Sequence, residues 1–438
     1  MKQINVAILG CGTVGTGVAR LLLENRDVIQ NRTGCDLYLK YVADIDTQRD
    51  RGILFPAGVM IPDAAVAIAD PDVHIVVETI GGETIAKSLM LSAISHGKQV
   101  VTANKALLAK HGNAIITAAL EKGVDLGYEA SVGGCMPIIK TIRESLVGNR
   151  ILAMTGILNG TCNYILSKIT DEGINFETAL AQAQSRGYAE QDPTLDVEGI
   201  DTAHKLALLS AIAFGMHINF DDISIEGISR ITPLDIAFAA QFGYRIKLLA
   251  ISKFDGRFVE ARVHPTMIPF DNMLSNVNGT FNAVTIRADA VGDMLLYGHG
   301  AGMMPTASAI VSDLVDIARN MGCSGAGRVP VMGFQPETLR TLPILPMDEI
   351  ITHYYIRFDV LDRPGVLSSI AGILGQYSIS LQSVHQKGRS SDGSVPVVML
   401  THRVREASVN AALKEIRKLE VVVDRPMLIR IEDANACD

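Results

Sequence analysis

The N-terminus of this chain carries the feature that most restricts its fold. Residues 3–9 read as a buried strand, and the sequence GCGTVGTG follows at once and opens a predicted helix at about 13–25. Gly10, Gly12 and Gly15 form the pattern G-x-G-x-x-G, whose glycines allow a tight turn and a close approach of the backbone to a pyrophosphate. The helix N-terminus then attracts the phosphate charge. A glycine-rich turn without a ligand is the alternative, but the strand–helix context favours a dinucleotide site.

The residues after this motif continue to alternate between strand and helix. This alternation predicts a parallel, doubly wound sheet, with a dinucleotide-binding domain over residues 1–130. The expected strands lie at 37–43, 73–79, 99–103 and 124–129, and the expected helices at 84–96, 104–110 and 113–122.

The residues near the second strand leave the choice between NAD and NADP open. Asp44 ends that strand and could bind a ribose diol, which favours NAD. Arg49 and Arg51 lie just beyond it and could hold a 2′-phosphate, which favours NADP. We therefore expect an NAD(P) cofactor, with NADP slightly preferred.

Two further units follow the first sheet. The middle of the chain predicts a second sheet covered by helices on one face, and a helix at 306–320 that returns to the first domain. Its strands are expected at 154–158, 259–265 and 284–288, and its helices at 162–171, 176–185, 201–214 and 233–253. Residues 321–350 read as a linker, and the tail over 351–438 has the order βαββαβ of a ferredoxin-like domain.

The segment GYAEQDPTLDVEGIDTAHKLAL, residues 187–208, concentrates the chemistry. Asp201 and Lys205 are four residues apart, so on a helix they share one face. A lysine at the head of a buried helix needs a partner, and a carboxylate that steers a partly buried ammonium can serve proton transfer. The alternatives are an ordinary supporting ion pair and a solvated acidic loop. The carboxylates of the segment are Glu190, Asp192, Asp196, Glu198 and Asp201.

A second lysine lies at the end of a predicted strand. Asn104 and Lys105 follow the strand at 99–103 directly. Ligands bind at the carboxyl ends of the strands in parallel sheets, so Lys105 is a candidate for contact with substrate or cofactor. A solvated lysine at a helix start is the alternative.

Composition excludes several classes of function. Of the 438 residues, 48% are hydrophobic and 20% charged, and the net charge of −8 comes with no basic block. This argues against a nucleic-acid partner and against an anionic membrane surface. Six cysteines without a CxxC pair indicate reduced thiols in a cytoplasmic protein. We expect no signal peptide, no membrane span and no structural zinc.

Six motifs occur in one order along the chain: GCGTVGTG, TANKALL, YEASVGG, ILNGTCNYIL, GYAEQDPTLDVEGIDTAHKLALLSA and DRPGVLSSIA. Together they resemble the homoserine dehydrogenase family with a C-terminal ACT domain. The similarity runs over nearly the whole chain, and the block GYAE-x-DPT-x-DV-x-G-x-D-x-x-x-K is highly specific. The resemblance implies NAD(P)-dependent interconversion of L-aspartate 4-semialdehyde and L-homoserine, a step towards threonine, methionine and isoleucine.

The resemblance also implies roles for single residues. Lys205 is expected to protonate the carbonyl oxygen and Lys105 to lie at the reacting centre, while Glu190 and Asp201 bind substrate and Asp196 supports them. An ammonium aimed at the developing alkoxide suits this chemistry, and two neighbouring lysines should lower each other's pKa. The expected cofactor-binding residues are Gly10, Gly12, Thr13, Val14, Gly15, Asp44, Arg51, Lys105, Gly187, Glu190 and Gly302.

Three expectations concern regulation and assembly. The resemblance implies a monovalent-cation site, for Na⁺ or K⁺, at the Glu129 carboxylate and the carbonyls of Val132, Gly134 and Met136, where the residues alone show a glycine-rich turn. It implies L-threonine as an effector bound at 362–367, although a tail that only dimerises is the alternative. Residues 131–305 become the substrate-binding, catalytic and dimerisation domain of a dimer or tetramer.

Two other functions compete with this interpretation. A catalytically silent sensor of nucleotides and amino acids would have no reason to keep both Lys105 and Lys205. A dehydrogenase for a different amino-acid semialdehyde should lack the block around residues 187–208.

Overall fold

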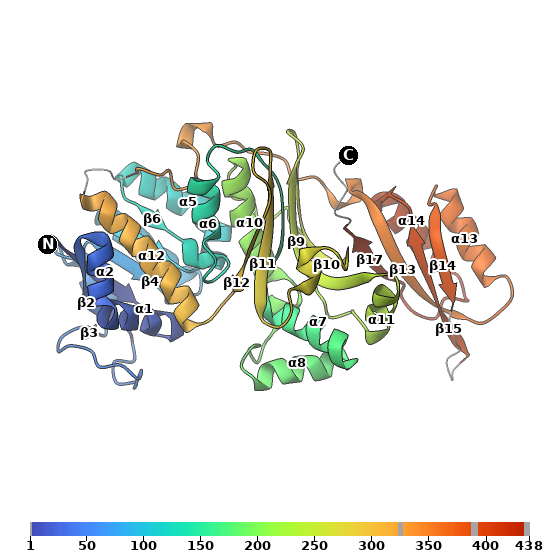
Figure 1. The fold of residues 1–438 in the computed structure, drawn as a ribbon, viewed down its shortest axis with the longest axis horizontal. Coiled ribbons are helices and arrows are strands. Elements are labelled where there is room, and N and C mark those ends of the chain that lie inside the picture. The colour runs from blue at the N-terminus through green and yellow to red at the C-terminus, as the bar shows by residue number, and fades with distance from the viewer. Residues whose placement is uncertain (1, 323–326, 387–392, 433–438) are drawn as a thin grey trace.

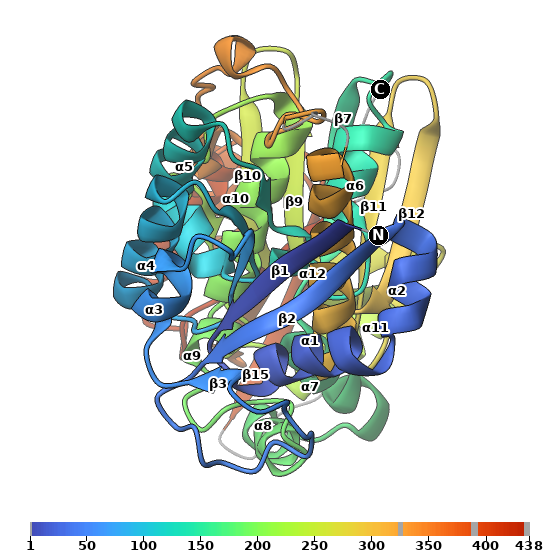
Figure 2. The same ribbon diagram turned by 90° about the vertical axis from the view of Figure 1, so that its left-hand side faces the viewer.

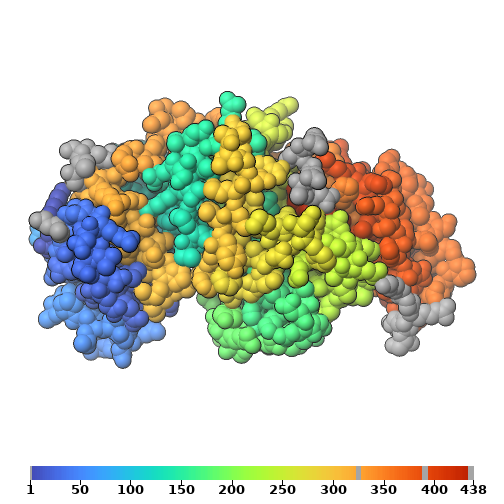
Figure 3. Space-filling model, in the orientation of Figure 1, coloured from blue at the N-terminus to red at the C-terminus, as the bar shows by residue number. Residues whose placement is uncertain are grey.

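A computed structural model describes residues 2–322, 327–386 and 393–432. Three units follow one another along its long axis: a dinucleotide-binding fold, a central sheet with helices, and the C-terminal tail (Figures 1 and 3). None of the helices in these ranges is long and apolar enough to cross a membrane.

The first unit is a parallel six-stranded sheet in the order β3-β2-β1-β4-β5-β6, which confirms the predicted doubly wound fold. Its strands are β1 (Lys2–Leu9), β2 (Cys35–Ala43), β3 (Met60–Ile61), β4 (Ile75–Glu78), β5 (Gln99–Thr102) and β6 (Leu126–Gly127). Its helices are α1 (Thr13–Glu24), α2 (Arg26–Thr33), α3 (Ala64–Ala69), α4 (Thr84–Ser95) and α5 (Lys105–Lys122). Figure 2 shows β1 and β2 in front, with α3, α4 and α5 on one side and α1 on the other.

The prediction of two helices at 104–110 and 113–122 is wrong, because α5 runs without a break. Gly112 lies inside it and is buried, and a Cβ at this position would be 2.6 Å from the Cδ1 atom of Ile218. The glycine therefore serves the close packing of a neighbouring side chain rather than ending the helix.

The second unit supplies one half of an eleven-stranded sheet. Its strands are β7 (Ile151–Ile157), β8 (Ser224–Ile225), β9 (Tyr244–Phe254), β10 (Val259–Pro269), β11 (Phe281–Ala288) and β12 (Gly292–His299). Helices α7 (Gly160–Glu172), α8 (Phe176–Ser185), α9 (Thr194–Val197), α10 (Ile200–Phe214) and α11 (Pro233–Gln241) belong to the same unit. The short helix α6 (Ile138–Lys140) and a π-helical turn at Thr141–Ser145 precede β7, and α12 (Met303–Gly322) crosses back to pack on α1.

The predicted helix at 233–253 is wrong over its second half. Helix α11 ends at Gln241, and Tyr244–Phe254 forms β9 between β7 and β10. The centre of β9, LLAI at 248–251, is a short, continuously apolar and buried run, which periodicity cannot distinguish from a buried helix. The prediction also missed β12, the short outer strand that pairs with β11.

The tail confirms the predicted order βαββαβ. It contains β13 (Ile351–Leu361), α13 (Val366–Gln376), β14 (Leu381–Gln386), β15 (Ser394–Thr401), α14 (Glu406–Ile416) and β17 (Met427–Ile431), with a short β16 (Val404–Arg405) beside β13. The tail sheet joins the central sheet, because β17 pairs in parallel with β10 at Thr266 and Met267.

Two groups of charged side chains fasten the tail to the central unit. The fully buried carboxylate of Asp235, on α11, accepts hydrogen bonds from the Tyr355 hydroxyl at 3.0 Å and from the Arg357 Nε atom at 2.8 Å. Arg430 on β17 donates to Glu226 at 2.6 Å and also pairs with Glu406. The tail is therefore a docked part of the molecule.

Candidate active site

Helix α10 positions one of the two candidate lysines. Gly199 precedes the helix with a φ of +82°, and every residue from Asp201 to Phe214 is buried. The Lys205 Nζ atom donates to the Asp201 Oδ2 atom at 2.7 Å and to the Leu158 carbonyl at 2.6 Å. Only 10% of either charged side chain is exposed, so this pair lies inside the protein rather than on a solvated helix face.

The second lysine reaches the same carboxylate from the other unit. The Asn104 side chain caps α5 by accepting a hydrogen bond from Leu107 N, and this cap fixes where the helix begins. Lys105 is the first residue of α5, and its Nζ atom lies 3.2 Å from the Asp201 Oδ1 atom. Its side chain is 37% exposed, so Lys105 reaches solvent, whereas Lys205 is buried. Asp201 therefore joins the carboxyl end of β5 to the head of α10.

The charges in this cluster stabilise one another. The carboxylate of Asp201 raises the pKa of Lys105, more than burial lowers it. Burial alone would raise the pKa of Asp201, but the ammonium groups of Lys205 and Lys105 outweigh it and hold that pKa below its usual range. The expectation that the two lysines lower each other's pKa is wrong for Lys105, because the carboxylate lies between them.

Asp196 joins the cluster through an amide. Asp196 makes no hydrogen bond or ion pair with Lys205 in the described structure; its Oδ1 atom accepts from the Asn159 Nδ2 atom at 2.6 Å. The same Nδ2 atom donates to Asp201 Oδ2 at 2.9 Å. Asn159 lies in the motif ILNGTCNYIL but is not among the site residues predicted from the sequence. Its position as a helix cap directly after a strand was the available signal.

Glu190 and Gly187 lie on the loop that leads into α9. The loop is held by a hydrogen bond of 2.6 Å from the Thr161 hydroxyl to the Tyr188 carbonyl. The Glu190 carboxylate is exposed and makes no hydrogen bond or ion pair with other described residues, although its charge helps to raise the pKa of Lys105. Glu190 is therefore near the cluster and free to meet a ligand.

The glycine motif has the geometry that a dinucleotide requires. Gly10 has a φ of +92°, and a Cβ on Gly15 would lie 2.0 Å from the Gly10 carbonyl oxygen. Gly12 precedes α1 without a side-chain cap, so Thr13 and Val14 begin a helix whose first N–H groups have no capping side chain. Close contacts require glycine at positions 10 and 15, and the uncapped helix end suits a phosphate. The residues present therefore fit the cofactor.

Asp44 and Arg51 lie together beside this turn. Asp44 accepts hydrogen bonds from Cys11 N at 2.6 Å and from Asp46 N at 2.9 Å. The Arg51 guanidinium donates to the carbonyls of Cys11, Arg49 and Asp46, and only 4% of its side chain is exposed. Arg51 therefore supports the loop backbone. Arg49 makes no side-chain hydrogen bond within the described ranges.

Gly302 links the central unit to the dinucleotide fold. It has a φ of +126° and directly precedes α12. A Cβ on Gly17, in α1, would lie 2.9 Å from the Met303 side chain, so the first turn of α12 packs closely against α1. This contact brings Gly302 to the side of the fold that carries the glycine motif.

The expected cation ligands lie in one buried turn. Glu129 is 2% exposed, and its carboxylate accepts hydrogen bonds from Ile139 N at 3.0 Å and Lys140 N at 2.8 Å. Burial, and then the nearby charge of Asp313, raises the pKa of Glu129 to about 7. Val132, Gly134 and Met136 follow in the same turn, and Met136 O already accepts from Ile138 N. Within the described ranges, no three His, Cys, Asp or Glu residues form a metal cluster.

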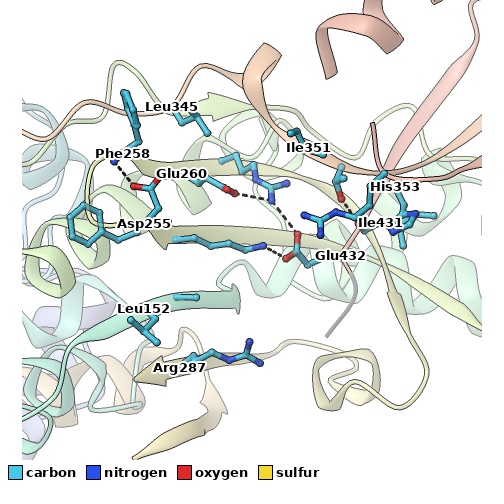
Figure 4. A pocket seen from close by; sticks show the side chains of 16 residues that line it. Leu152, Asp255, Phe258, Glu260, Arg287, Leu345, Ile351, His353, Ile431 and Glu432 are labelled. Atoms are coloured by element: carbon cyan, nitrogen blue, oxygen red, sulfur yellow. Dashed lines mark hydrogen bonds and ion pairs between the residues drawn. The ribbon is translucent and has the colours of Figure 1, made fainter. Parts of the chain in front are cut away.

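A separate pocket of about 490 Å³ lies where the central sheet meets the tail (Figure 4). Glu432 pairs there with Lys253 and accepts from Arg262 at 3.1 Å. The pocket contains none of the lysine–carboxylate cluster.

Comparisons with known proteins agree with this geometry. The family descriptions that match are "Homoserine dehydrogenase, NAD binding domain" over residues 10–129, "Homoserine dehydrogenase" over 137–315 and "ACT domain" over 354–421. The homoserine dehydrogenase of Pseudomonas aeruginosa is 47% identical over 441 residues, covering 99% of this chain and all of that protein. That of Neisseria gonorrhoeae is 44% identical over 432 residues, covering 99% of each chain.

Solved structures give the same result. The crystal structure of a homoserine dehydrogenase from Thiobacillus denitrificans matches with a TM-score of 0.93 and 46% identity over 99% of both chains. That of Staphylococcus aureus at pH 7.5 matches with a TM-score of 0.76 and 32% identity over 99% of both chains. The fold and the site thus define an NAD(P)-dependent oxidoreductase that acts on a CH–OH group. The chain belongs to the homoserine dehydrogenase family.

Proposed function

We propose that this chain interconverts L-aspartate 4-semialdehyde and L-homoserine, with Lys205 as the acid/base. The observation that carries the proposal is that Asp201 binds two ammonium groups, from two different units, beside the dinucleotide fold. The cofactor, when bound, supplies or accepts the hydride. In the reductive direction the aldehyde oxygen gains negative charge as the hydride adds to its carbon, and the Lys205 Nζ atom donates the proton that completes the alcohol.

Lys105 and the carboxylates divide the remaining tasks. Lys105, whose side chain is partly exposed to solvent, stabilises the developing alkoxide beside Lys205. Asp201 is already engaged with Lys105, Lys205 and Asn159, which keeps both lysines in place. Glu190 is the exposed carboxylate nearby and so suits the α-ammonium group of the substrate.

Oxidation of L-homoserine, followed by absorbance with NAD and with NADP in parallel, tests the proposal and the preference for NADP. Lys205→Ala should lower kcat at least about 10²-fold with unchanged cofactor affinity, because a positioned acid/base contributes about 10²–10⁴-fold. Lys168→Ala is the matched control, since Lys168 and Glu172 form the same i,i+4 pair on α7 without touching the cluster. Full activity of Lys205→Ala would refute the assigned role.

The ACT domain is proposed to bind L-threonine and to inhibit the enzyme. Gly365 precedes α13 with a φ of +91° and without a side-chain cap, so no capping side chain competes with a carboxylate at this helix N-terminus. The docking of the tail through Asp235 and Arg357 supports transmission to the central unit. Homoserine oxidation by the full chain should fall when millimolar L-threonine is added, and an unchanged rate would contradict this proposal.

A monovalent cation is proposed to bind the turn of Glu129, Val132, Gly134 and Met136. Carbonyl and carboxylate oxygens suit a hard ion, and a bound cation would offset the burial and the Asp313 charge that raise the pKa of Glu129. The thermal midpoint should be higher in NaCl or KCl than in tetramethylammonium chloride at equal ionic strength. Equal midpoints would count against the site.

We also propose a homo-oligomer. The central sheet and the turn after β10 expose large apolar side chains, among them Leu152, Met273 and Tyr297, which a second copy would cover. Light scattering should give the mass of a dimer or tetramer, and the mass of a monomer would contradict the proposal.

A further inference from the structure

Among the residues around Lys205, Asn159 contacts more of the others than any residue except Asp201. It follows Leu158, whose carbonyl holds Lys205, and it caps α7. Its side chain is buried, and all of its hydrogen-bonding groups are used. The Oδ1 atom accepts from Cys162 N at 2.8 Å, while the Nδ2 atom donates to Asp196 at 2.6 Å and to Asp201 at 2.9 Å.

Capping alone does not require an asparagine here. A cap needs one acceptor, which serine or aspartate offers about as well. The two N–H donors of the amide serve a different need, because they bind the carboxylates of both Asp196 and Asp201. Burial, with the charge of Asp201 as a smaller cause, raises the pKa of Asp196. A neutral donor between the two carboxylates allows them to lie together without a further cation.

We infer that Asn159 is the positioning residue of the acid/base pair. Its Nδ2 atom and the Lys205 Nζ atom donate to the same oxygen, Oδ2 of Asp201. The amide therefore fixes the orientation of the carboxylate that holds Lys205. The neighbouring Leu158 carbonyl fixes Lys205 from its other side, so one turn between β7 and α7 supplies both restraints. This inference rests on the roles proposed above for Asp201 and Lys205.

The variants Asn159→Ser and Asn159→Asp test the inference, because both keep the acceptor that caps α7. Asn159→Ser removes the bridge between the carboxylates, so kcat for homoserine oxidation should fall at least about tenfold, with cofactor affinity unchanged within about twofold. Asn159→Asp places a third carboxylate beside the lysines. Oxidation needs a lysine without its proton, and the added charge holds that proton more tightly, so the rising limb of the pH–rate profile should move up by at least about half a pH unit.

Asn175 provides the matched control. It caps α8 in the same way, accepting from Thr178 N at 2.9 Å, but it is exposed and far from both carboxylates in the hydrogen-bond network. Asn175→Ser and Asn175→Asp should leave kcat and the pH–rate profile unchanged. If the two Asn159 variants behave in the same way, Asn159 is only a helix cap and the inference is overturned.

Two further outcomes are decisive. A change confined to cofactor affinity in Asn159→Ser would also overturn the inference, since a positioning residue acts on kcat. Should Asn159→Asp fail to fold, Asn159→Ser decides alone. The Lys205→Ala variant distinguishes failure of the positioning role from failure of the proposed function. If Lys205→Ala is inactive while the Asn159 variants are normal, only the positioning role of Asn159 is wrong. An active Lys205→Ala variant would refute the proposed function itself.

Discussion

Replacing Asp201 by asparagine should destabilise the protein by about 4 kcal/mol at neutral pH. Asp201 is 8% exposed, and its close partner Lys205 lies 2.7 Å away. Two unit charges about 4 Å apart interact by about 4 kcal/mol at an effective dielectric constant of about 20. Removing one partner of a buried pair typically costs about 3–5 kcal/mol. Lys105 adds a smaller contribution than Lys205, because its more exposed side chain is partly screened by solvent.

The effect should depend on pH in one direction. The pKa of Asp201 is lowered in the folded protein, so the stabilisation is fully present above the unfolded carboxyl pKa of about 4. This stabilisation is lost as the pH falls towards the lower pKa that Asp201 has in the folded protein. The difference between wild type and Asp201→Asn should therefore be constant from about pH 5 to pH 8 and should shrink below about pH 4.

Urea denaturation followed by circular dichroism measures this difference, since the chain has no tryptophan for fluorescence. Asp192→Asn is the control, because among the described residues this exposed carboxylate bonds only Thr194, so its loss should change stability by less than about 0.5 kcal/mol. The predicted contribution of the buried ion pair would be refuted if Asp201→Asn lowered the free energy of unfolding by less than about 1 kcal/mol. It would also be refuted if the decrease were the same in acid as at neutral pH.

Three other predictions concern the cofactor turn, the cation turn and the tail. Gly15→Ala should abolish dinucleotide binding in titration calorimetry, because its Cβ would lie 2.0 Å from the Gly10 carbonyl; retained affinity would contradict the tight turn. The pKa of Glu129 is raised to about 7, so the folded state binds the extra proton and wild-type stability should fall by about 3 kcal/mol from pH 5 to pH 8. In denaturation curves measured across this pH range, Glu129→Gln should show a smaller change of stability with pH. An equal change in wild type and variant would contradict the raised pKa of Glu129. Asp235→Asn should weaken docking of the tail on the central unit by about 3–5 kcal/mol, because it removes a buried partner of Arg357. Denaturation curves test this, and a single unfolding transition unchanged from wild type would contradict the prediction.

The sequence predicted well those features that depend on local pattern. The glycine motif, the strand–helix alternation and the tail order are each encoded in neighbouring residues, and the structure confirms them. The pair of Asp201 and Lys205 also followed from helical spacing. Hydrophobic periodicity did not identify the strand at 244–254, because a strand buried on both faces does not alternate between apolar and polar residues.

Features that depend on tertiary contact could not be predicted from pattern. Lys105 and Asp201 meet only because α5 packs against α10, and nothing near either residue indicates that the carboxylate lies between the two lysines. The opposite sign of the Lys105 pKa shift follows from that contact. The connection of Asp196 to Asp201 depends on the amide of Asn159, which local sequence shows only as a helix cap.

The pairing of β17 with β10 has a consequence for the order of folding during synthesis. The central sheet is completed by Met427–Ile431, which are synthesised long after the residues of β10. Until then one edge of β10 near Thr266 has no neighbour, and buried Arg262 lacks Glu432. A nascent chain that does not yet contain β17 therefore presents an open strand edge, which is a hazard for aggregation until β17 pairs with β10. The tail thus also protects the edge of a sheet that belongs to the central unit.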